Sequence, residues 1–192
     1  MGHRISKVYT CTGDDGSTGL GSGERIAKNH PRIETMGDID ELNCAIGLML
    51  SDAINQPIHE IFTDIQHRLF DLGGELCLPD REFINAEMTL KIEHIIDELN
   101  ATLPALKEFI LPQGDSSTAH CHLARAICRR AERRLVSLSQ QENINKHSLI
   151  YLNRLSDLLF VTARIFARDA STEESLWQTA IKRKPETTTN KK

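Results

Sequence analysis

Apolar residues recur every three or four positions along most of the chain, a spacing typical of helices with one buried face. The pattern predicts helices over residues 33–50, 57–78, 85–104, 116–139 and 145–170. Pro57 suits a first helical turn, Pro79 would end the second helix, and Asn85 and Asn145 are suited to N-caps. Almost nothing is typical of a strand. We therefore predict an all-α fold, a bundle of about five helices.

Residues 1–33 lack this period and are expected to form an extended loop ahead of the helices. Residues 13–23 hold five of the 11 glycines, interleaved with serine and threonine. Glycine lets backbone N–H groups turn toward an anion and hydroxyls add donors, so this is a candidate phosphate-binding loop. It fits neither a P-loop nor a G-x-G-x-x-G fingerprint, because no Gly-Lys-Ser/Thr follows and position 24 is glutamate. The alternative is a flexible surface loop.

Composition fits one soluble globular domain. The 192 residues are 40% hydrophobic, 26% charged and 5% aromatic, which favours an aliphatic core of packed helices. The last 11 residues hold five Lys or Arg and one Glu, whereas the rest of the chain is acidic, which argues against a nucleic-acid partner. We predict one domain over residues 1–176, comprising a loop (1–33) and a bundle (34–170), and a basic, disordered tail over 177–192.

Cysteine use indicates a reducing compartment, and the hydropathy of the chain gives no sign of a membrane segment. The five cysteines are odd in number and form no C-x-x-C pair, which argues for free thiols. The first residues contain no apolar signal segment, and no run of about 18 apolar residues occurs. The sequence predicts a soluble, cytoplasmic protein without a membrane partner.

Charged residues on the helix predicted over 116–139 form a stripe. The face expected to pack inward consists of Leu123, Ala124, Ile127, Ala131, Leu135 and Leu138. The opposing stripe consists of Arg125, Arg129, Glu132 and Arg133, with Arg130 and Arg134 further round. Arginine binds phosphate bidentately, and a glutamate among arginines would fix their orientation. A solvated face without a ligand is the alternative.

The helix predicted over 145–170 is nearly all apolar, apart from a narrow polar line. Four side chains fall within about 60° of one another: Asn153, Asp157, Arg164 and Arg168. Unpaired buried charges are costly, so this line indicates either a polar site between helices or internal ion pairs with the helix over 116–139. In the first helix, Asp40 and Glu41 either complement the helix dipole or pair with an arginine, which would lie across a subunit boundary if the protein is an oligomer.

Six short motifs follow one another over roughly residues 7–168. The first three form an N-terminal signature: Thr10-x-Thr-Gly-Asp-Asp-Gly-x-Thr-Gly-Leu20, Gly23-Glu-Arg-x-x-Lys28 and Gly37-x-x-Asp-Glu-Leu-Asn43. The later ones are Phe109-Ile-Leu-Pro112, Arg125-Ala-x-Cys-Arg-Arg-Ala-Glu-Arg-Arg134 and Leu152-Asn-Arg-Leu-Ser-Asp-x-Leu-Phe160. Together they resemble the PduO-type ATP:corrinoid adenosyltransferases. Cys11 departs from the family pattern, which usually has a basic residue there, and this would weaken one contact to the triphosphate.

The resemblance implies transfer of the 5′-deoxyadenosyl group of ATP to the cobalt of cob(I)alamin, with release of triphosphate, by a homotrimer with ATP at its subunit interfaces. By motif position, the phosphates would contact Thr10, Cys11, Thr12, Gly13, Thr18, Gly19 and Lys28. The helices would complete the ATP site with Arg129, Arg130, Ala131, Glu132, Arg133 and Asn153. Asp40 and Arg125 match an interfacial pair. Phe109 matches an aromatic that keeps the lower base of cobalamin off the cobalt, and Asp157 an acid near the same place.

This implied chemistry explains the lack of a nucleophile and general base, because cob(I)alamin is itself the nucleophile. Arg129, Arg133 and Mg²⁺ carried by ATP would stabilise the charge on the leaving triphosphate in an in-line geometry. Phe109 and Asp157 complete the predicted catalytic set. A cobalamin reductase or a B12-dependent enzyme is a possible partner, and no certain protein-bound metal site is predicted.

Three alternative functions compete with this interpretation. A di-iron carboxylate bundle needs paired Glu-x-x-His motifs, and Asp64-Ile-Gln-His67 is the nearest approach. His120 and His122 with Cys121 and Cys128 suggest a metal, but they lack further ligands at helical spacing. A non-catalytic ATP- or corrinoid-binding sensor on the same fold is the third, and the intact arginine helix favours catalysis over it.

Overall fold

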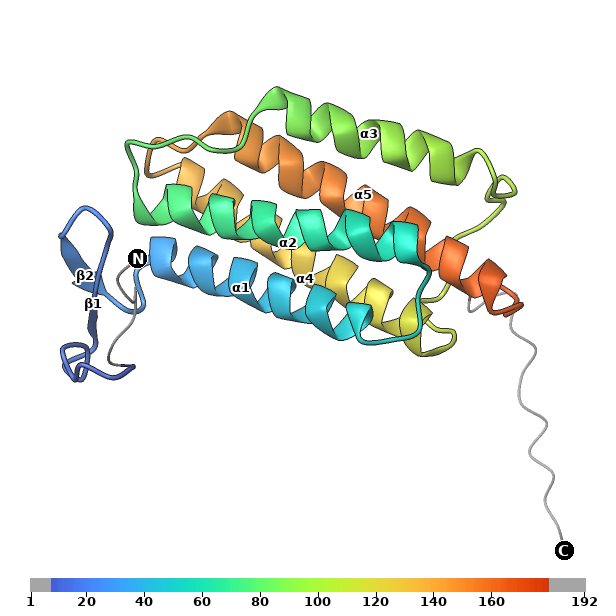
Figure 1. The fold of residues 1–192 in the computed structure, drawn as a ribbon, viewed down its shortest axis with the longest axis horizontal. Helices are drawn as coiled ribbons and strands as arrows, with labels where there is room; N and C mark the ends of the chain where they lie inside the picture. The colour runs from blue at the N-terminus through green and yellow to red at the C-terminus, as the bar shows by residue number, and fades with distance from the viewer. Residues whose placement is uncertain (1–7, 180–192) are drawn as a thin grey trace, which may run out of the picture.

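The computed structural model describes residues 8–179 of the chain. Five helices form an elongated bundle (Figure 1): α1 (Pro31–Leu50), α2 (Gln56–Cys77), α3 (Ala86–Asn100), α4 (Ser116–Ser139) and α5 (Lys146–Asp169). The prediction of five helices is confirmed. The basic tail predicted over 177–192 lies outside the described residues from position 180 onward. None of the described helices is long and apolar enough to span a bilayer.

Local capping residues explain most of the helix bounds. Side-chain oxygens of Asn55, Asn85 and Asn145 accept hydrogen bonds from backbone N–H groups in the first turns of α2, α3 and α5. Two predicted bounds are wrong. α1 begins at Pro31, because proline fits a first turn and His30 remains extended as its cap. α3 ends at Asn100, four residues before Pro104, where the chain leaves the helix in turns.

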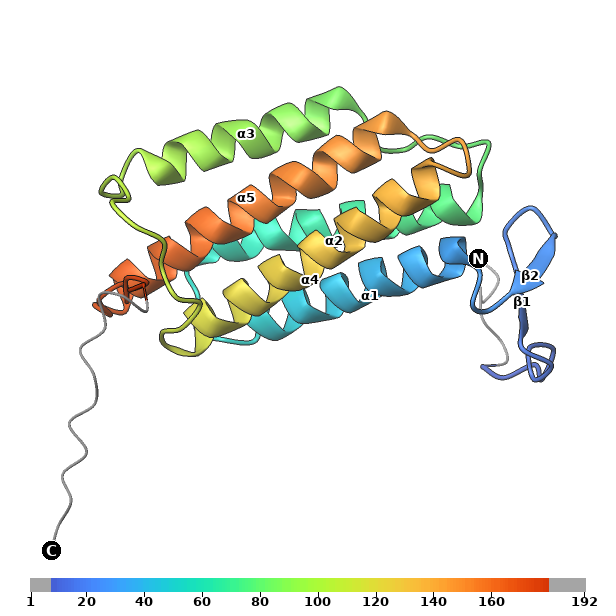
Figure 2. The ribbon, with the colours of Figure 1, turned by 180° about the vertical axis from the view of Figure 1, so that it is seen from behind.

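The core runs along the centre of the bundle. α5 packs against both α3 and α4, while α1 packs against α2 and α4 (Figure 2). Leu152, Leu155 and Leu158 of α5 are fully buried. The expected inward face of α4 is buried except for Leu123, whose prediction is wrong because it is 49% exposed. It lies about 80° from the centre of that face, at its edge.

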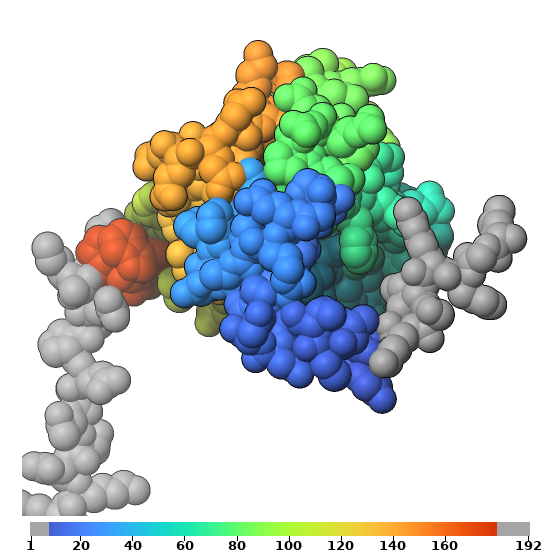
Figure 3. All heavy atoms as spheres, turned by 90° about the vertical axis from the view of Figure 1, so that its left-hand side faces the viewer, coloured from blue at the N-terminus to red at the C-terminus, as the bar shows by residue number. Residues whose placement is uncertain are grey.

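A two-stranded hairpin precedes the bundle, contrary to the prediction of no strands. β1 (Ser17–Gly19) pairs antiparallel with β2 (Arg25–Ala27), and Ser17 lies opposite Ala27. Seen end-on in Figure 3, the blue segment that contains the hairpin covers the N-terminal end of α1, beside the α4–α5 turn and the α2–α3 connection. Because β1 lies within the glycine-rich segment, its pairing with β2 fixes the backbone of that segment.

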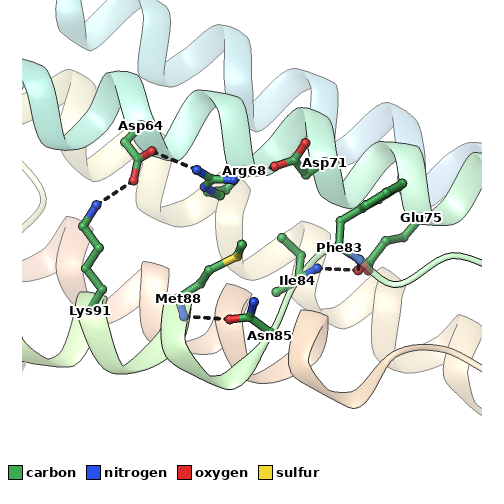
Figure 4. Close-up of polar contacts among 9 residues, drawn as sticks. All are labelled: Asp64, Arg68, Asp71, Glu75, Phe83, Ile84, Asn85, Met88 and Lys91. Carbon is green, nitrogen blue, oxygen red and sulfur yellow. Dashed lines mark hydrogen bonds and ion pairs between the residues drawn. The ribbon is translucent and has the colours of Figure 1, made fainter.

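A buried carboxylate ties three segments together near this end. The Glu75 Oε1 atom accepts hydrogen bonds from the backbone N–H groups of Phe83 and Ile84 and, at 3.0 Å, from Asn145 Nδ2. Oε2 accepts the Ser148 hydroxyl at 2.5 Å. Figure 4 shows Phe83 and Ile84 beside Glu75. Because a buried carboxylate needs such partners, this network holds the α2–α3 connection against the start of α5.

Candidate functional site

The glycine-rich loop is held in shape by Arg25. Its guanidinium donates to the Thr12 carbonyl and to the Ser17 hydroxyl, both at 2.5 Å. The Ser17 hydroxyl and N–H in turn donate to Asp15, and these bonds lower the pKa of the Asp15 carboxyl. Cys11 has a φ of 58°, and Gly16 and Gly23 have φ of 83° and 90°. Such positive φ values turn successive N–H groups in directions that a regular strand does not allow.

The predicted phosphate-binding residues lie together in this loop. Thr10 and Thr12 hydroxyls are 2.9 Å apart, while Thr18 and Gly19 belong to β1. A Cβ on Gly13 would lie 3.2 Å from Lys28 Nζ, so the absence of a side chain at Gly13 makes room for the ammonium group. Lys28 Nζ has no ion pair with another described residue. The loop therefore combines hydroxyls, turned backbone and an uncompensated cation, which suits an anion.

The arginines of α4 fall into two groups. Arg130 is engaged within the chain: its Nε donates to Asp38 at 2.9 Å and its Nη2 pairs with Glu41, and the bond to Glu41 is the main cause that raises its pKa. Arg129 and Arg133 are exposed. Arg129 reaches no nearer than 3.9 Å to Glu132, and Arg133 donates to the Arg129 carbonyl at 2.9 Å. Their charges are thus left available to a ligand.

Glu132 of α4 and Asn153 of α5 form a polar contact beside Arg129 and Arg133. Glu132 Oε1 accepts a 2.7 Å hydrogen bond from Asn153 Nδ2. Ala131 is fully buried, so its side chain packs in the core instead of facing a ligand. Asp157 is exposed and pairs with Arg154 at 3.2 Å. The structure therefore brings Glu132, Asn153 and Asp157 to one side of α4 and α5, next to Arg129 and Arg133.

The polar line on α5 divides in two. Its second half contacts segments other than α4: buried Arg164 donates to Glu174 at 2.6 Å and to the Pro104 carbonyl at 2.8 Å. Arg168 donates to Thr102 Oγ1 at 2.8 Å. These arginines fasten the α3–α4 connection and the segment after α5. The alternative of ion pairs with α4 is therefore wrong for Arg164 and Arg168, whose ion-pair partners lie outside α4.

A mostly apolar pocket of about 560 Å³ lies beside the N-terminal half of α4. Its lining includes Phe109, His122, Arg125 and Phe160. The Phe109 ring is 78% exposed and contacts Trp177 edge to face, with ring centroids 6.5 Å apart. Leu111 N–H donates to the Ser175 carbonyl at 2.8 Å, so the segment after α5 pairs with the Phe109 loop. An exposed aromatic edge thus overhangs an apolar pocket.

Two buried nitrogens at this pocket lack hydrogen-bond partners among the residues described. They are Nδ1 of His122 and Nε of Arg125. Burial, and then the charge of Arg125, lower the pKa of His122 to about 4. Burial and the neighbouring Arg129 lower the pKa of Arg125. Asp40, the predicted partner of Arg125, is exposed on α1 and makes no contact with Arg125 within the chain.

Sequence reasoning missed His122, Phe160 and Trp177 as parts of the site. The sequence predicts that His120 and His122 are ordinary helical residues. His120 pairs with Asp52 at 2.8 Å, far from a metal arrangement, and the described residues contain no cluster of three or more ligands suited to a metal ion. Only the aromatic character of positions 160 and 177 hinted at the pocket. Phe160 lies on α5 beside His122, whereas Trp177 contacts Phe109 from the segment after α5, which has no helical period.

The phosphate-binding loop and the α4 arginines do not meet within one chain. No hydrogen bond or ion pair among the described residues joins the loop to Arg129 or Arg133. The hairpin lies beyond the N-terminal end of α1, outside the bundle, whereas α4, which carries these arginines, is part of the bundle (Figures 1 and 2). The two halves of the predicted nucleotide site are therefore separate on a single subunit.

Comparisons with known proteins agree with the motifs. The family model described as cobalamin adenosyltransferase matches residues 8–166. A cobalamin adenosyltransferase of Cupriavidus metallidurans is 48% identical over 93% of this chain and 97% of its own, and a corrinoid adenosyltransferase of Bacillus subtilis is 46% identical over 83% and 86%.

Solved structures give the same result. A phenylalanine-to-alanine variant of the PduO-type ATP:corrinoid adenosyltransferase of Lactobacillus reuteri, complexed with cobalamin and ATP, is 36% identical with a TM-score of 0.86. The match covers 90% of this chain and all of that one. An arginine-to-lysine variant from the same organism, complexed with ATP, is 37% identical with a TM-score of 0.84, over 89% of this chain and all of that one. This chain therefore belongs to the cobalamin adenosyltransferase family.

Proposed function

We propose that this protein transfers the 5′-deoxyadenosyl group of ATP to the cobalt of cob(I)alamin, forming adenosylcobalamin and releasing triphosphate. The observation that carries the proposal is the arrangement on α4. Arg125 lines the Phe109 pocket, and Arg129 and Arg133 follow it by one and two turns along the same face. An apolar pocket for a corrin ring and a cationic strip for a polyphosphate therefore adjoin on one helix.

The residues would divide the work between the two substrates. Arg129 and Arg133 would neutralise the charge that develops on the leaving triphosphate, while the Glu132–Asn153 hydrogen bond supports α4 beside them. Phe109 would cover the lower face of the corrin, with Asp157 nearby. Mg²⁺ would enter with ATP on the triphosphate oxygens. Catalysis then rests on positioning and electrostatics and needs no protein nucleophile.

The nucleotide site would be completed by assembly. A homotrimer of the proposed kind would place the loop of one subunit, with Thr12, Gly13 and Lys28, against the α4 arginines of its neighbour. The free Nε of Arg125 and the exposed Asp40 support a pairing across that boundary. Five cysteines without a disulfide among the described residues fit a reducing cytoplasm.

Anaerobic incubation with ATP, Mg²⁺ and chemically reduced cobalamin tests the reaction. We expect the spectrum of adenosylcobalamin to appear together with triphosphate, which chromatography measures. ATP binding without either product would instead indicate a sensor on the same fold and overturn the proposal.

The Arg133→Ala variant should lower kcat about a hundredfold, the usual effect of losing a group that stabilises developing negative charge. Arg134→Ala is the matched control, because Arg134 lies on the same helix but points toward Asp38, 3.5 Å away. Turnover at the wild-type rate in Arg133→Ala would refute the role of Arg133.

A further inference from the structure

A second cavity lies on the opposite side of the bundle from α4. α2 packs on α1 and α3 packs on α5, so a groove of about 570 Å³ is left between α2 and α3, with α5 beneath it. Figure 4 looks into this groove, with α2 above, α3 below and α5 behind. Its volume is within the usual range for small-molecule sites. The adenosyl-transfer site described above uses none of its residues.

The walls of the groove are mainly apolar. α2 contributes Ile61 and Ile65, and α3 contributes Met88, Leu90, Ile92 and Ile95. The Met88 side chain extends from α3 toward α2 (Figure 4). Leu90 is 52% exposed at the rim, whereas Ile65 and Ile92 are buried. Walls of this kind favour a ligand with an apolar body.

Four charged side chains at the rim, Asp64, Arg68, Asp71 and Lys91, form ion pairs with one another. Lys91 reaches across from α3 to Asp64 on α2, with Nζ 2.9 Å from Oδ2 (Figure 4). Arg68 pairs with Asp64 at 3.3 Å and with Asp71 at 2.9 Å. Burial opposes ionisation of Asp64, but Lys91 and Arg68 outweigh it and lower its pKa. Asp64, Lys91 and Arg68 are therefore already paired, whereas Glu87, which also lines the groove, is exposed and has no ion pair among the described residues.

The floor of the groove is formed in part by a buried tyrosine. Tyr151 of α5 lines the groove and is 1% exposed. Its hydroxyl makes no hydrogen bond to any residue that the structure describes. Burial raises the pKa of Tyr151, so the phenol is neutral and can both donate and accept. A polar group of a ligand in the groove could therefore supply the hydrogen bond that the protein does not.

We propose that the α2–α3 groove binds an uncharged small molecule with an apolar, ring-sized body and one carbonyl or hydroxyl group, which pairs with the Tyr151 hydroxyl. The apolar walls would cover the body of the ligand, and the carboxylates of Glu87 and Asp64 at the rim would disfavour a carboxylate ligand. This site is independent of the proposed adenosyl transfer, since it lies on the other side of α5 from Glu132 and Asn153.

Fluorine NMR titrations of the full chain test the proposal with three matched probes. They are 4-fluoroacetophenone, which carries a carbonyl, 1-ethyl-4-fluorobenzene, which lacks it, and 4-fluorobenzoate, which is charged. We expect the ketone to bind most tightly and the benzoate most weakly. The absence of binding by the ketone, or preference for the benzoate, would overturn the proposal.

The Tyr151→Phe variant isolates the hydrogen bond. It removes a hydroxyl that has no protein partner, so the fold should be retained. Affinity for the ketone should fall about fivefold, the usual effect of one neutral hydrogen bond, while affinity for the ethyl compound stays the same. Tyr9→Phe, which changes the other tyrosine of the chain, should alter neither. Equal loss for both compounds in Tyr151→Phe, or no loss for the ketone, would contradict the assigned contact.

The Leu90→Trp variant locates the binding. Its indole would project from the half-exposed rim over the groove and should reduce the affinity of both neutral probes at least tenfold, with the circular-dichroism spectrum and melting temperature unchanged. Undiminished binding in this variant would place the probes elsewhere on the protein and refute the site. Because these readouts measure binding alone, they are unaffected by whether the adenosyl transfer occurs.

Discussion

At the scale of single residues, His122 stands out among the groups that line the Phe109 pocket. It is 4% exposed, its Nδ1 has no partner among the described residues, and it lies beside Phe160 with ring centroids 6.4 Å apart. Burial and the neighbouring Arg125 lower its pKa to about 4, while Glu174 acts in the opposite direction. The folded protein therefore holds a neutral imidazole at neutral and mildly acidic pH.

This predicts a loss of stability in mild acid. The unfolded chain takes up a proton on His122 near pH 6.5, whereas the folded chain does so only near pH 4. The free energy of unfolding should therefore fall as the pH drops from 6.5 to 4, by on the order of 3 kcal/mol from this residue. In His122→Leu, urea denaturation at a series of pH values should show a smaller fall.

The exposed His67 on α2 provides the matched control for that experiment. His67→Gln should keep the pH dependence of the wild type, because the His67 side chain is exposed and lies on a different helix from His122. A His122→Leu profile parallel to that of the wild type would show that His122 is not held neutral.

At the scale of secondary-structure elements, the Phe109 loop is fastened by the segment after α5. Ile110 forms an isolated bridge with Leu176, and Trp177 N–H donates to the Phe109 carbonyl at 2.7 Å. Trp177 also contacts the Phe109 ring. Phe109 is therefore positioned by both backbone pairing and an aromatic contact, although the loop has no regular structure of its own.

Trp177 is the single tryptophan of the chain, so its fluorescence reports on this contact. If cobalamin binds against Phe109, the corrin ring lies close to the indole and should quench the emission in a saturable manner. ATP alone should leave the emission nearly unchanged. Unaltered tryptophan emission, under conditions in which equilibrium dialysis shows bound cobalamin, would place the corrin away from Phe109.

Elements with local signals could be predicted from the sequence, and those without could not. Asn85 and Asn145 cap helices through bonds to residues two or three positions away, which a sequence displays directly. The strands β1 and β2 have three residues each, too few to show an alternation of apolar and polar positions. Helical spacing likewise could not show that Arg130 pairs with Asp38, 92 positions away.

At the scale of the whole molecule, the candidate nucleotide site is split between two regions of one chain. The family motifs identified both halves, yet no local pattern indicates that the loop and the α4 arginines remain apart on a single subunit. The uncompensated Lys28 at the loop and the unpaired Arg133 on α4 are what a shared site across a subunit boundary would require. Heterologous contacts generate a closed ring when the rotation between neighbouring subunits closes.

Co-expression of two defective chains tests this arrangement. Lys28→Ala damages the loop and Arg133→Ala damages α4, so each variant alone should be nearly inactive. If each site combines the loop of one subunit with the arginines of the next, random mixing in a ring makes about a quarter of the sites intact. Turnover of the mixture should then recover to about a quarter of the wild-type value, whereas separately purified variants combined without subunit exchange should remain inactive. If both halves of each site came from the same chain, every site in the mixture would carry one defect, and turnover would stay at the level of the single variants.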